Sequence, residues 1–138
     1  MKIGNFILCD DIRYEVGSKL SLMGVYADSI EFSVPPDKKD TWPKRIRVAV
    51  YLTADLEGKK SSAFKIRAVH EQDEVIFGEG SFEQGIEHKL KIGMVNRNFA
   101  FETDGEYKFF LDIFDEKGKL IESSEPAFSV IVKERVVE

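Results

Sequence analysis

The chain has 138 residues, close to the commonest size of a single domain, and 43% of them are hydrophobic, which is ordinary for a globular protein. The net charge of −5, from 25 acidic and 20 basic residues, disfavours non-specific binding to nucleic acid. Cys9 is the only cysteine, so no internal disulfide can form. Because the sequence also shows no secretory signal and no membrane span, we expect a cytoplasmic protein.

The first third of the chain predicts short strands separated by turns. Two strands, Ile12–Val16 and Leu20–Tyr26, are expected on either side of a glycine-serine turn. A further strand should end at Val34, because the two prolines that follow cannot donate to a sheet ladder. The segment Asp37–Pro43 is then expected to be the longest irregular crossing, with room for one helical turn.

The rest of the chain shows a hydrophobic period of two residues, which is typical of half-buried strands. In Ile46–Leu56 every even position is apolar, and this predicts one long strand. Gly80–Gly85 is expected to be a loop. The alternation returns in the segments Phe64–Ala68, Leu90–Met94, Tyr107–Phe114 and Phe128–Val132. In total the pattern predicts nine or ten strands and no helix.

Strands at this spacing, without intervening helices, predict an all-β protein. We expect residues 1–138 to form a single domain, a two-sheet antiparallel β-sandwich of the immunoglobulin-like or C2-like kind. Tyr107 follows an acidic residue and a glycine, as does the tyrosine that opens the sixth strand of immunoglobulin-like domains and bonds back to the backbone. A plain turn followed by a core aromatic residue explains the same pattern.

Residues for catalysis or metal binding are sparse. His70 and His88 are the only histidines, and neither belongs to a metal-binding spacing. The acidic residues at the expected loops stand nearly alone, whereas calcium sites gather several carboxylates. No nucleophile motif or phosphate-binding loop is present. The sequence therefore favours a protein without a cofactor, and a binding protein over an enzyme.

Two surfaces stand out in the predicted strands. The first is basic and includes Tyr51, and it could follow a nucleic-acid backbone if its strands are neighbours, although a solvated sheet face is the better explanation. Its cations share the outward phase of three strands: Arg45, Arg47, Lys65, Arg67, Lys89 and Lys91. The second is apolar, because Phe110, Phe114 and Ile131 point outward from late strands. Their cover could be the crossing that contains Trp42, or a second copy of the chain.

The segment Cys9–Tyr26 resembles the opening of a family of small uncharacterised bacterial proteins, which begin with Cys-Asp-Asp-x-Arg, then Glu, Gly and Lys, and end this part with Gly-Val-Tyr or Gly-Val-Phe. A proline-containing stretch and a long alternating strand follow in the family, as Pro35-Pro36 and Ile46–Leu56 do here. The resemblance implies a bacterial cytosolic protein of unknown function, and it implies nothing about a substrate.

The same segment contains a set of polar residues at a spacing of two. Asp11, Arg13 and Glu15 should share one face of a strand, and Lys19 lies just across the turn. These side chains could form an ion-pair network that fixes the register of the hairpin. Alternatively they form a binding patch, with Asp10 or Asp11 as hydrogen-bond acceptor and Arg13 as an anion contact.

Three hypotheses for function follow. The first is a non-catalytic binding or scaffold module that contacts a protein partner, or a second copy of itself, and no membrane. The second is a metal-binding or enzymatic domain that uses the region Cys9–Glu15 together with a histidine. The third is single-stranded nucleic-acid binding through the basic sheet face.

Overall fold

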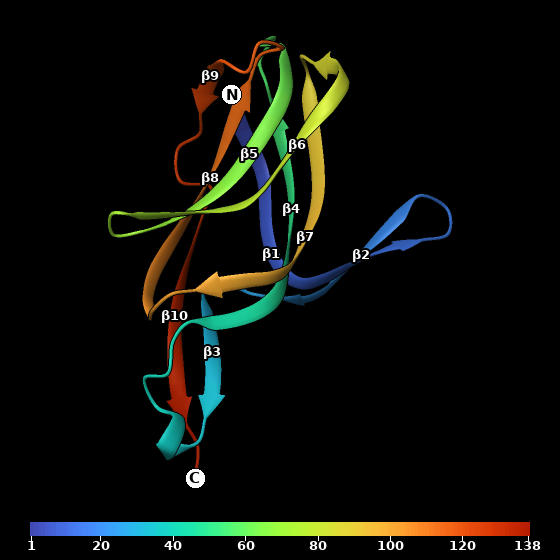
Figure 1. The fold of residues 1–138 in the computed structure, drawn as a ribbon. Helices are drawn as coiled ribbons and strands as arrows, with labels where there is room; N and C mark the ends of the chain where they lie inside the picture. Colours follow the sequence, from blue (N-terminus) through green and yellow to red (C-terminus); the bar gives the residue numbers. More distant parts are fainter.

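A computed structural model describes residues 1–138, which form ten strands, one short 3₁₀ turn and no α-helix, arranged in two sheets (Figure 1). This confirms the prediction of an all-β protein. One sheet has four strands, in the spatial order β2 (Lys19–Val25), β1 (Lys2–Glu15), β4 (Lys44–Asp55) and β7 (Lys89–Phe101). The other has the order β3 (Ser29–Val34), β10 (Phe128–Val136), β8 (Gly105–Phe114), β5 (Ser61–His70) and β6 (Asp73–Ile86), with β9 (Leu120–Ser123) paired to β8.

The prediction of a wholly antiparallel sandwich is wrong for one pair of strands. In the six-stranded sheet β3 runs parallel to β10, from the pair Ser29 and Ile131 to the pair Val34 and Val136. Parallel strands need a crossover rather than a hairpin, and here nearly the whole chain lies between the two. Periodicity alone carries no information about such a distant pairing.

Alternation in β4 builds the centre of the four-stranded sheet. Val48, Val50 and Leu52 are fully buried, as expected from the even apolar positions. In the register, Val50 lies between Leu8 of β1 and Met94 of β7. A bulge between Ile46 and Val48 shifts the register with β7 by one residue. Burial of each of these side chains stabilises the fold by about 1.5–3 kcal/mol.

The core between the sheets is one cluster of 21 buried residues drawn from both sheets. Aromatic rings join the layers: Phe99 of β7 lies 5.4 Å from Phe77 of β6 and 6.4 Å from Phe109 of β8. The ring of Phe6 in β1 also lies 5.7 Å from that of Phe109. Tilted and edge-to-face contacts of this kind add about 0.5–1.5 kcal/mol each to the burial of area.

The expected hydrogen bond from a tyrosine back to the backbone is present at the start of β8. The buried Tyr107 donates its hydroxyl to the Thr103 carbonyl at 2.6 Å and accepts from the Thr103 amide at 3.2 Å. His70 stacks on the same ring at 4.6 Å and fills the space beside Gly105, whose φ of 122° suits glycine. This histidine therefore packs at the rim of the core.

Of two predicted connecting segments, one is present in the structure and the other is not. The 3₁₀ turn Pro36–Lys38 lies where one helical turn was allowed in the proline-rich crossing. Trp42 in this crossing packs edge-on against Phe32 at 6.3 Å, with the Lys44 ammonium above its ring. The loop predicted at Gly80–Gly85 is instead part of β6, which runs through it with a register shift opposite β5.

Candidate functional site

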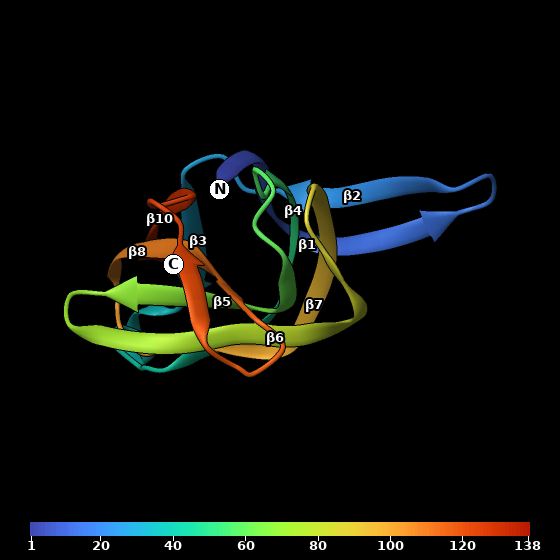
Figure 2. The same ribbon diagram turned by 90° about the horizontal axis from the view of Figure 1, so that it is seen from above.

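The hairpin of β1 and β2 projects from the sandwich (Figures 1 and 2). The first part of β1, up to Cys9, pairs with β4, whereas the part beyond it pairs only with β2. The strands are joined by Val16–Ser18, in which Gly17 and Ser18 have φ of 85° and 60°. We call residues Asp11–Val25 the arm.

The arm exposes large hydrophobic side chains. Ten large hydrophobic residues of the whole chain are exposed, and half of them lie between positions 14 and 25. Val16 at the tip is 93% exposed and Tyr14 is 73% exposed. The others in this stretch are Leu20, Met23 and Val25. Single exposed hydrophobic residues are common, but a concentration on one projecting hairpin marks a contact surface.

The base of the arm rests on the outer face of the four-stranded sheet, the face turned away from the core. Cys9, Ile12 and Ala49 form a small buried cluster there, and Tyr51 and Val95 pack against it. Tyr51 lies opposite Gly93 in the register of β4 and β7. A β-carbon built on Gly93 would stand 3.5 Å from Cδ1 of Ile12 and 2.9 Å from the hydroxyl of Tyr14.

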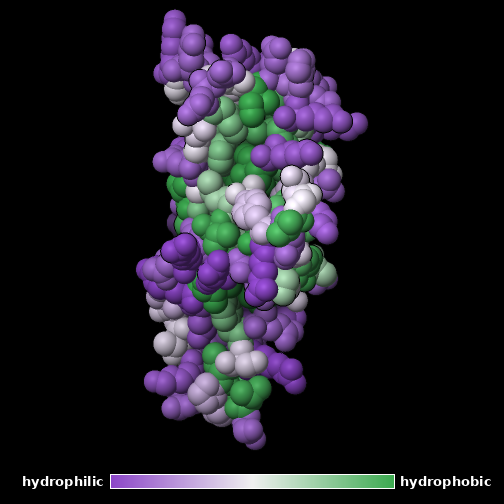
Figure 3. Space-filling model, turned by 90° about the vertical axis from the view of Figure 1, so that its right-hand side faces the viewer, coloured by the Kyte–Doolittle hydropathy of each residue, from purple (hydrophilic) through white to green (hydrophobic).

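A cleft of about 630 Å³ lies between the arm and this outer face. Tyr14 and Leu20 form the apolar part of the arm side, and Tyr51 with Gly93 forms part of the sheet side. The remaining lining residues are polar: Glu15, Ser18, Lys19 and Lys91. The side of the molecule on which the arm projects carries a central band of hydrophobic residues bordered by hydrophilic ones (Figure 3).

The predicted polar residues of the arm do lie in one phase, but they do not form a network. The pairs from Asp11 with Met23 to Glu15 with Lys19 follow without a shift, so Asp11, Arg13 and Glu15 alternate with Ile12 and Tyr14. Asp11 forms its ion pair with Arg47 of β4, at 2.8 Å. Arg13, Glu15 and Lys19 form no ion pair, so the expected network that would fix the hairpin register is absent.

Asp10 stands apart from this set and turns toward the base of β2. Its carboxylate accepts a hydrogen bond from the hydroxyl of Tyr26, and it occupies the space beside Gly24. Burial and then the neighbouring Asp10 raise the pKa of Tyr26 above its usual value, because both disfavour a phenolate. The φ of 65° at Gly24 allows the two strands to adopt this arrangement. Asp10 therefore stabilises the base of the hairpin.

The basic surface expected from the sequence is divided between the two sheets. Its residues on β4 and β7 lie in the four-stranded sheet, whereas Lys65 and Arg67 belong to β5 in the other sheet. The condition that the three strands be neighbours is therefore not met. Arg67 is also engaged, because its Nε donates to Asp112 at 2.8 Å. Only Lys91 of the six predicted cations lines the cleft.

The outward phenylalanines of β8 are covered by cations from β5. The Arg67 guanidinium lies 4.5 Å from the ring centre of Phe110, and the Lys65 ammonium lies 5.5 Å from that of Phe114. Both rings are half-buried. Trp42 does not supply this cover, since it packs on Phe32. Ile131 of β10 is 42% exposed and lies apart from the cleft.

Candidate groups for metal or nucleophilic chemistry are not assembled. Cys9 is fully buried, and burial raises the pKa of its thiol, which donates to the Asp11 carbonyl. His70 is held by Tyr107 and the Glu106 carbonyl, while the exposed His88 lies beside Glu87. No group of three or more histidine, cysteine, aspartate or glutamate side chains is placed to hold a metal ion.

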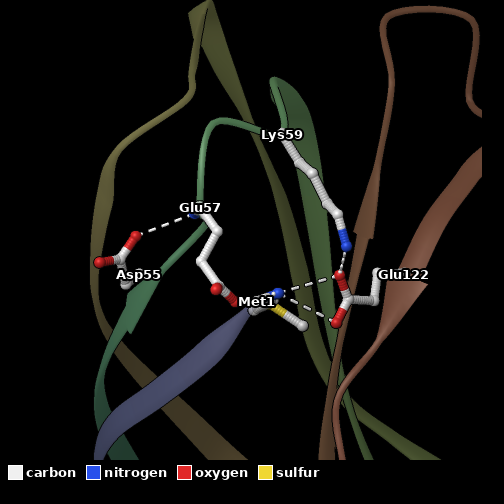
Figure 4. A network of polar contacts seen from close by, with 5 residues as sticks. All are labelled: Met1, Asp55, Glu57, Lys59 and Glu122. Atoms are coloured by element: carbon white, nitrogen blue, oxygen red, sulfur yellow. Dashed lines mark hydrogen bonds and ion pairs between the residues drawn. The ribbon is translucent and has the colours of Figure 1, made fainter.

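A second polar cluster surrounds the start of β1, whereas the arm lies at the other end of that strand. Figure 4 shows this cluster from close by. The Met1 ammonium lies 2.8 Å from Glu57 and 3.0 Å from Glu122, and Lys59 also donates to Glu122. The pKa of Glu122 is lowered, first by the Lys59 hydrogen bond and then by the ammonium. These contacts connect the start of β1 with the loop after β4 and with β9, which belongs to the other sheet.

A family described as one of unknown function, DUF6941, matches residues 5–122. The chain belongs to this family. The match includes the arm, both sides of the cleft and the segment Cys9–Tyr26 that resembled a family opening. No curated protein matches the sequence. The structure contains no helix that could span a membrane.

Sequence reasoning identified the arm but missed Tyr14, Leu20 and Gly93 as parts of a site. The alternation of Ile12, Tyr14 and Val16 was visible, yet it looks the same in a strand that is buried and in one that projects. The turn at Gly17-Ser18 was a usable signal. It predicts a short hairpin with apolar residues on both strands, and no neighbouring segment of the sequence is expected to cover them.

Proposed function

We propose that the protein is a non-catalytic binding module whose arm and cleft contact a protein partner. The observation that carries this proposal is the set of five exposed hydrophobic side chains on one projecting hairpin. Aromatic and methionine side chains are enriched at protein interfaces, and Tyr14 and Met23 are of these kinds. Burial of this surface would supply the main driving force for association.

A polypeptide suits the cleft better than a small molecule does. Small-molecule sites enclose most of the ligand surface, and their walls are largely pre-formed. Here one wall is Tyr14, which is 73% exposed, and the arm is a two-stranded ribbon that stands away from the sandwich. A partner chain can cover both faces of such a ribbon, whereas a small ligand would remain mostly solvated.

Fewer observations support the two alternative functions, nucleic-acid binding and metal or covalent chemistry. For nucleic acid, Tyr51 and Lys91 share the cleft with Lys19, but the other predicted cations lie outside it and Arg67 is paired. For metal or covalent chemistry in Cys9–Glu15, the thiol is buried and meets no histidine. The surface of Phe110, Phe114 and Ile131 is a weaker protein-binding candidate than the arm, since cations cover both rings.

The cellular location of the protein and the type of its sandwich are also proposals. The single cysteine supports a reducing compartment such as the cytoplasm, and the resemblance of Cys9–Tyr26 to a bacterial family supports a bacterial protein. The bond from Tyr107 to the Thr103 backbone supports an immunoglobulin-like rather than a C2-like sandwich.

Site-specific photo-crosslinking in the native cells tests the binding proposal. A photoreactive residue replaces Val16 at the arm tip, and a matched control replaces Leu120, which is 50% exposed on β9. We expect a defined protein adduct from position 16 and none from position 120. Adding Tyr14→Ser and Leu20→Ser should abolish the adduct with little change in melting temperature. No adduct at position 16, or the same adducts at both positions, would contradict the proposal.

A further inference from the structure

Apart from the short strand β9, four strands end the two sheets, and three of them carry features that discourage pairing with another chain. β6 has Asp73, Glu74, Glu79 and Glu83 along its length, and β7 has Lys89, Lys91 and Arg97. β3 contains Glu31 and is followed by two prolines. Charged residues and prolines of this kind are the usual protection of a sheet edge.

The edge strand β2 lacks this protection. Its sequence, Lys-Leu-Ser-Leu-Met-Gly-Val, has one charge, on Lys19 at its first position beside the turn. The six residues Leu20–Val25 are uncharged and contain no proline. Leu20, Met23 and Val25 are also 40%, 42% and 58% exposed. A backbone edge with free hydrogen-bonding groups therefore lies next to exposed apolar side chains.

The charge of the arm is balanced, unlike that of the whole chain. Asp11 and Glu15 are matched by Arg13 and Lys19, so Asp11–Val25 has no net charge, whereas the chain carries −5. Contact between two arms therefore brings together two segments that carry no net charge.

We infer that the partner of the arm is a second copy of this chain, bound by antiparallel pairing of the two β2 strands across a two-fold axis. This inference rests on the proposed function and names its partner. The pairing would join two four-stranded sheets into one continuous sheet. An isologous contact requires a surface complementary to itself, and the uncharged stretch Leu20–Val25 meets that requirement.

A register centred on Leu22 illustrates the fit. Lys19 then stands opposite Val25 of the second copy, and Leu20 opposite Gly24, so no like charges face each other. The tip of each arm reaches the base of the other arm. Val16, which is 93% exposed in the single chain, then lies against the base of the other copy's arm.

Sedimentation of the whole chain at concentrations from about 5 to 200 μM tests the inference, because the mass of a dimer is twice 15.7 kDa. We expect a dimer for the natural sequence, monomers for Met23→Lys and for Val25→Lys, and a dimer for the control Leu120→Lys. Hydrogen exchange of the natural chain should show β2 amides protected at high concentration and exposed on dilution.

A monomer at every concentration would overturn the inference, as would a dimer that both β2 variants retain or that leaves β2 exchange unchanged. The same monomer together with an adduct to a different protein from position 16 would leave the binding proposal standing and assign the edge to that protein. A folded dimer whose crosslinks join only two copies supports the inference.

Discussion

The hydroxyl of Tyr14 lies 2.9 Å from the position that a β-carbon on Gly93 would take, so the arm lies this close to β7 because residue 93 has no side chain. The ring carbon Cζ of Tyr14 is 3.9 Å from that position, which is an ordinary contact. The close approach therefore involves only the tyrosine oxygen. This relationship allows the cleft to be altered without touching the core.

Gly93→Ala should displace Tyr14 while changing the free energy of unfolding by no more than about 0.5 kcal/mol, as is usual for surface sites. Backbone chemical shifts of the arm should report the displacement. The double variant Gly93→Ala with Tyr14→Phe is the control, because a phenylalanine ring leaves room for the new methyl group. Its arm shifts should match those of Tyr14→Phe alone. Unchanged arm shifts in Gly93→Ala would show that Tyr14 does not hold this position in solution.

Tyr107→Phe should destabilise the protein by about 1–2 kcal/mol, because it removes both hydrogen bonds to the Thr103 backbone and leaves these groups without a partner. Urea unfolding at constant slope measures the change. Tyr14→Phe provides the matched control, since its side chain is largely exposed and should cost less than about 0.5 kcal/mol. Equal effects of the two variants would mean that the Tyr107 hydroxyl contributes nothing specific.

Local pattern was enough to predict most of the strands, because alternation is a property of consecutive residues. The even positions of Ile46–Leu56 face the core as predicted, and the hydroxyl of Tyr107 meets the backbone only four residues away. Neither feature depends on which strands become neighbours.

Features that depend on distant pairing were not predictable in this way. Lys65 and Lys91 share an outward phase, but they lie in different sheets, because phase does not specify a neighbour. The parallel pairing of β3 with β10 was not predicted for the same reason. The cleft likewise forms only because β1 stops pairing with β4 after Cys9. The alternation of the sequence continues past Cys9 unchanged, so it does not indicate this point.

Arg67→Ala should be the most destabilising of these substitutions, at about 3 kcal/mol. Asp112 is 6% exposed, and its Oδ2 accepts from Arg67 while its Oδ1 has no partner, so removal of the guanidinium leaves a buried carboxylate uncompensated. It also uncovers Phe110. Urea unfolding at neutral pH measures the loss.

Two further variants separate the buried charge from simple loss of packing. Arg67→Met with Asp112→Leu removes both charges at similar volume and should recover most of the lost stability. Glu74→Gln removes only the exposed partner of Arg67, 3.5 Å away, and should cost about 0.5 kcal/mol or less. If the double variant were as unstable as Arg67→Ala, the buried carboxylate would not be the cause.

The cluster around Met1 and Glu122 should make stability depend on pH at both ends of the range. The pKa of Glu122 is lowered from 4.5, so its contribution is present above that value and is lost as pH falls through the folded-state pKa. The pKa of the Met1 ammonium is raised from 8.0, chiefly by its hydrogen bond to Glu57, so its contribution is present below that value and is lost as pH rises through the folded-state pKa.

Glu122→Gln should therefore lower the melting temperature most near pH 6, where both groups are charged. The difference from the natural sequence should shrink in acid, as Glu122 is protonated, and narrow again in alkali, as Met1 loses its proton while Lys59 retains its charge. Added salt should reduce this difference in melting temperature at every pH, since the side chains of Glu57 and Lys59 are exposed to solvent. Glu116→Gln is the control, because Glu116 forms no ion pair and its replacement should leave the pH profile unchanged. A Glu122→Gln profile parallel to the natural one at every pH would mean that the cluster is not formed in solution.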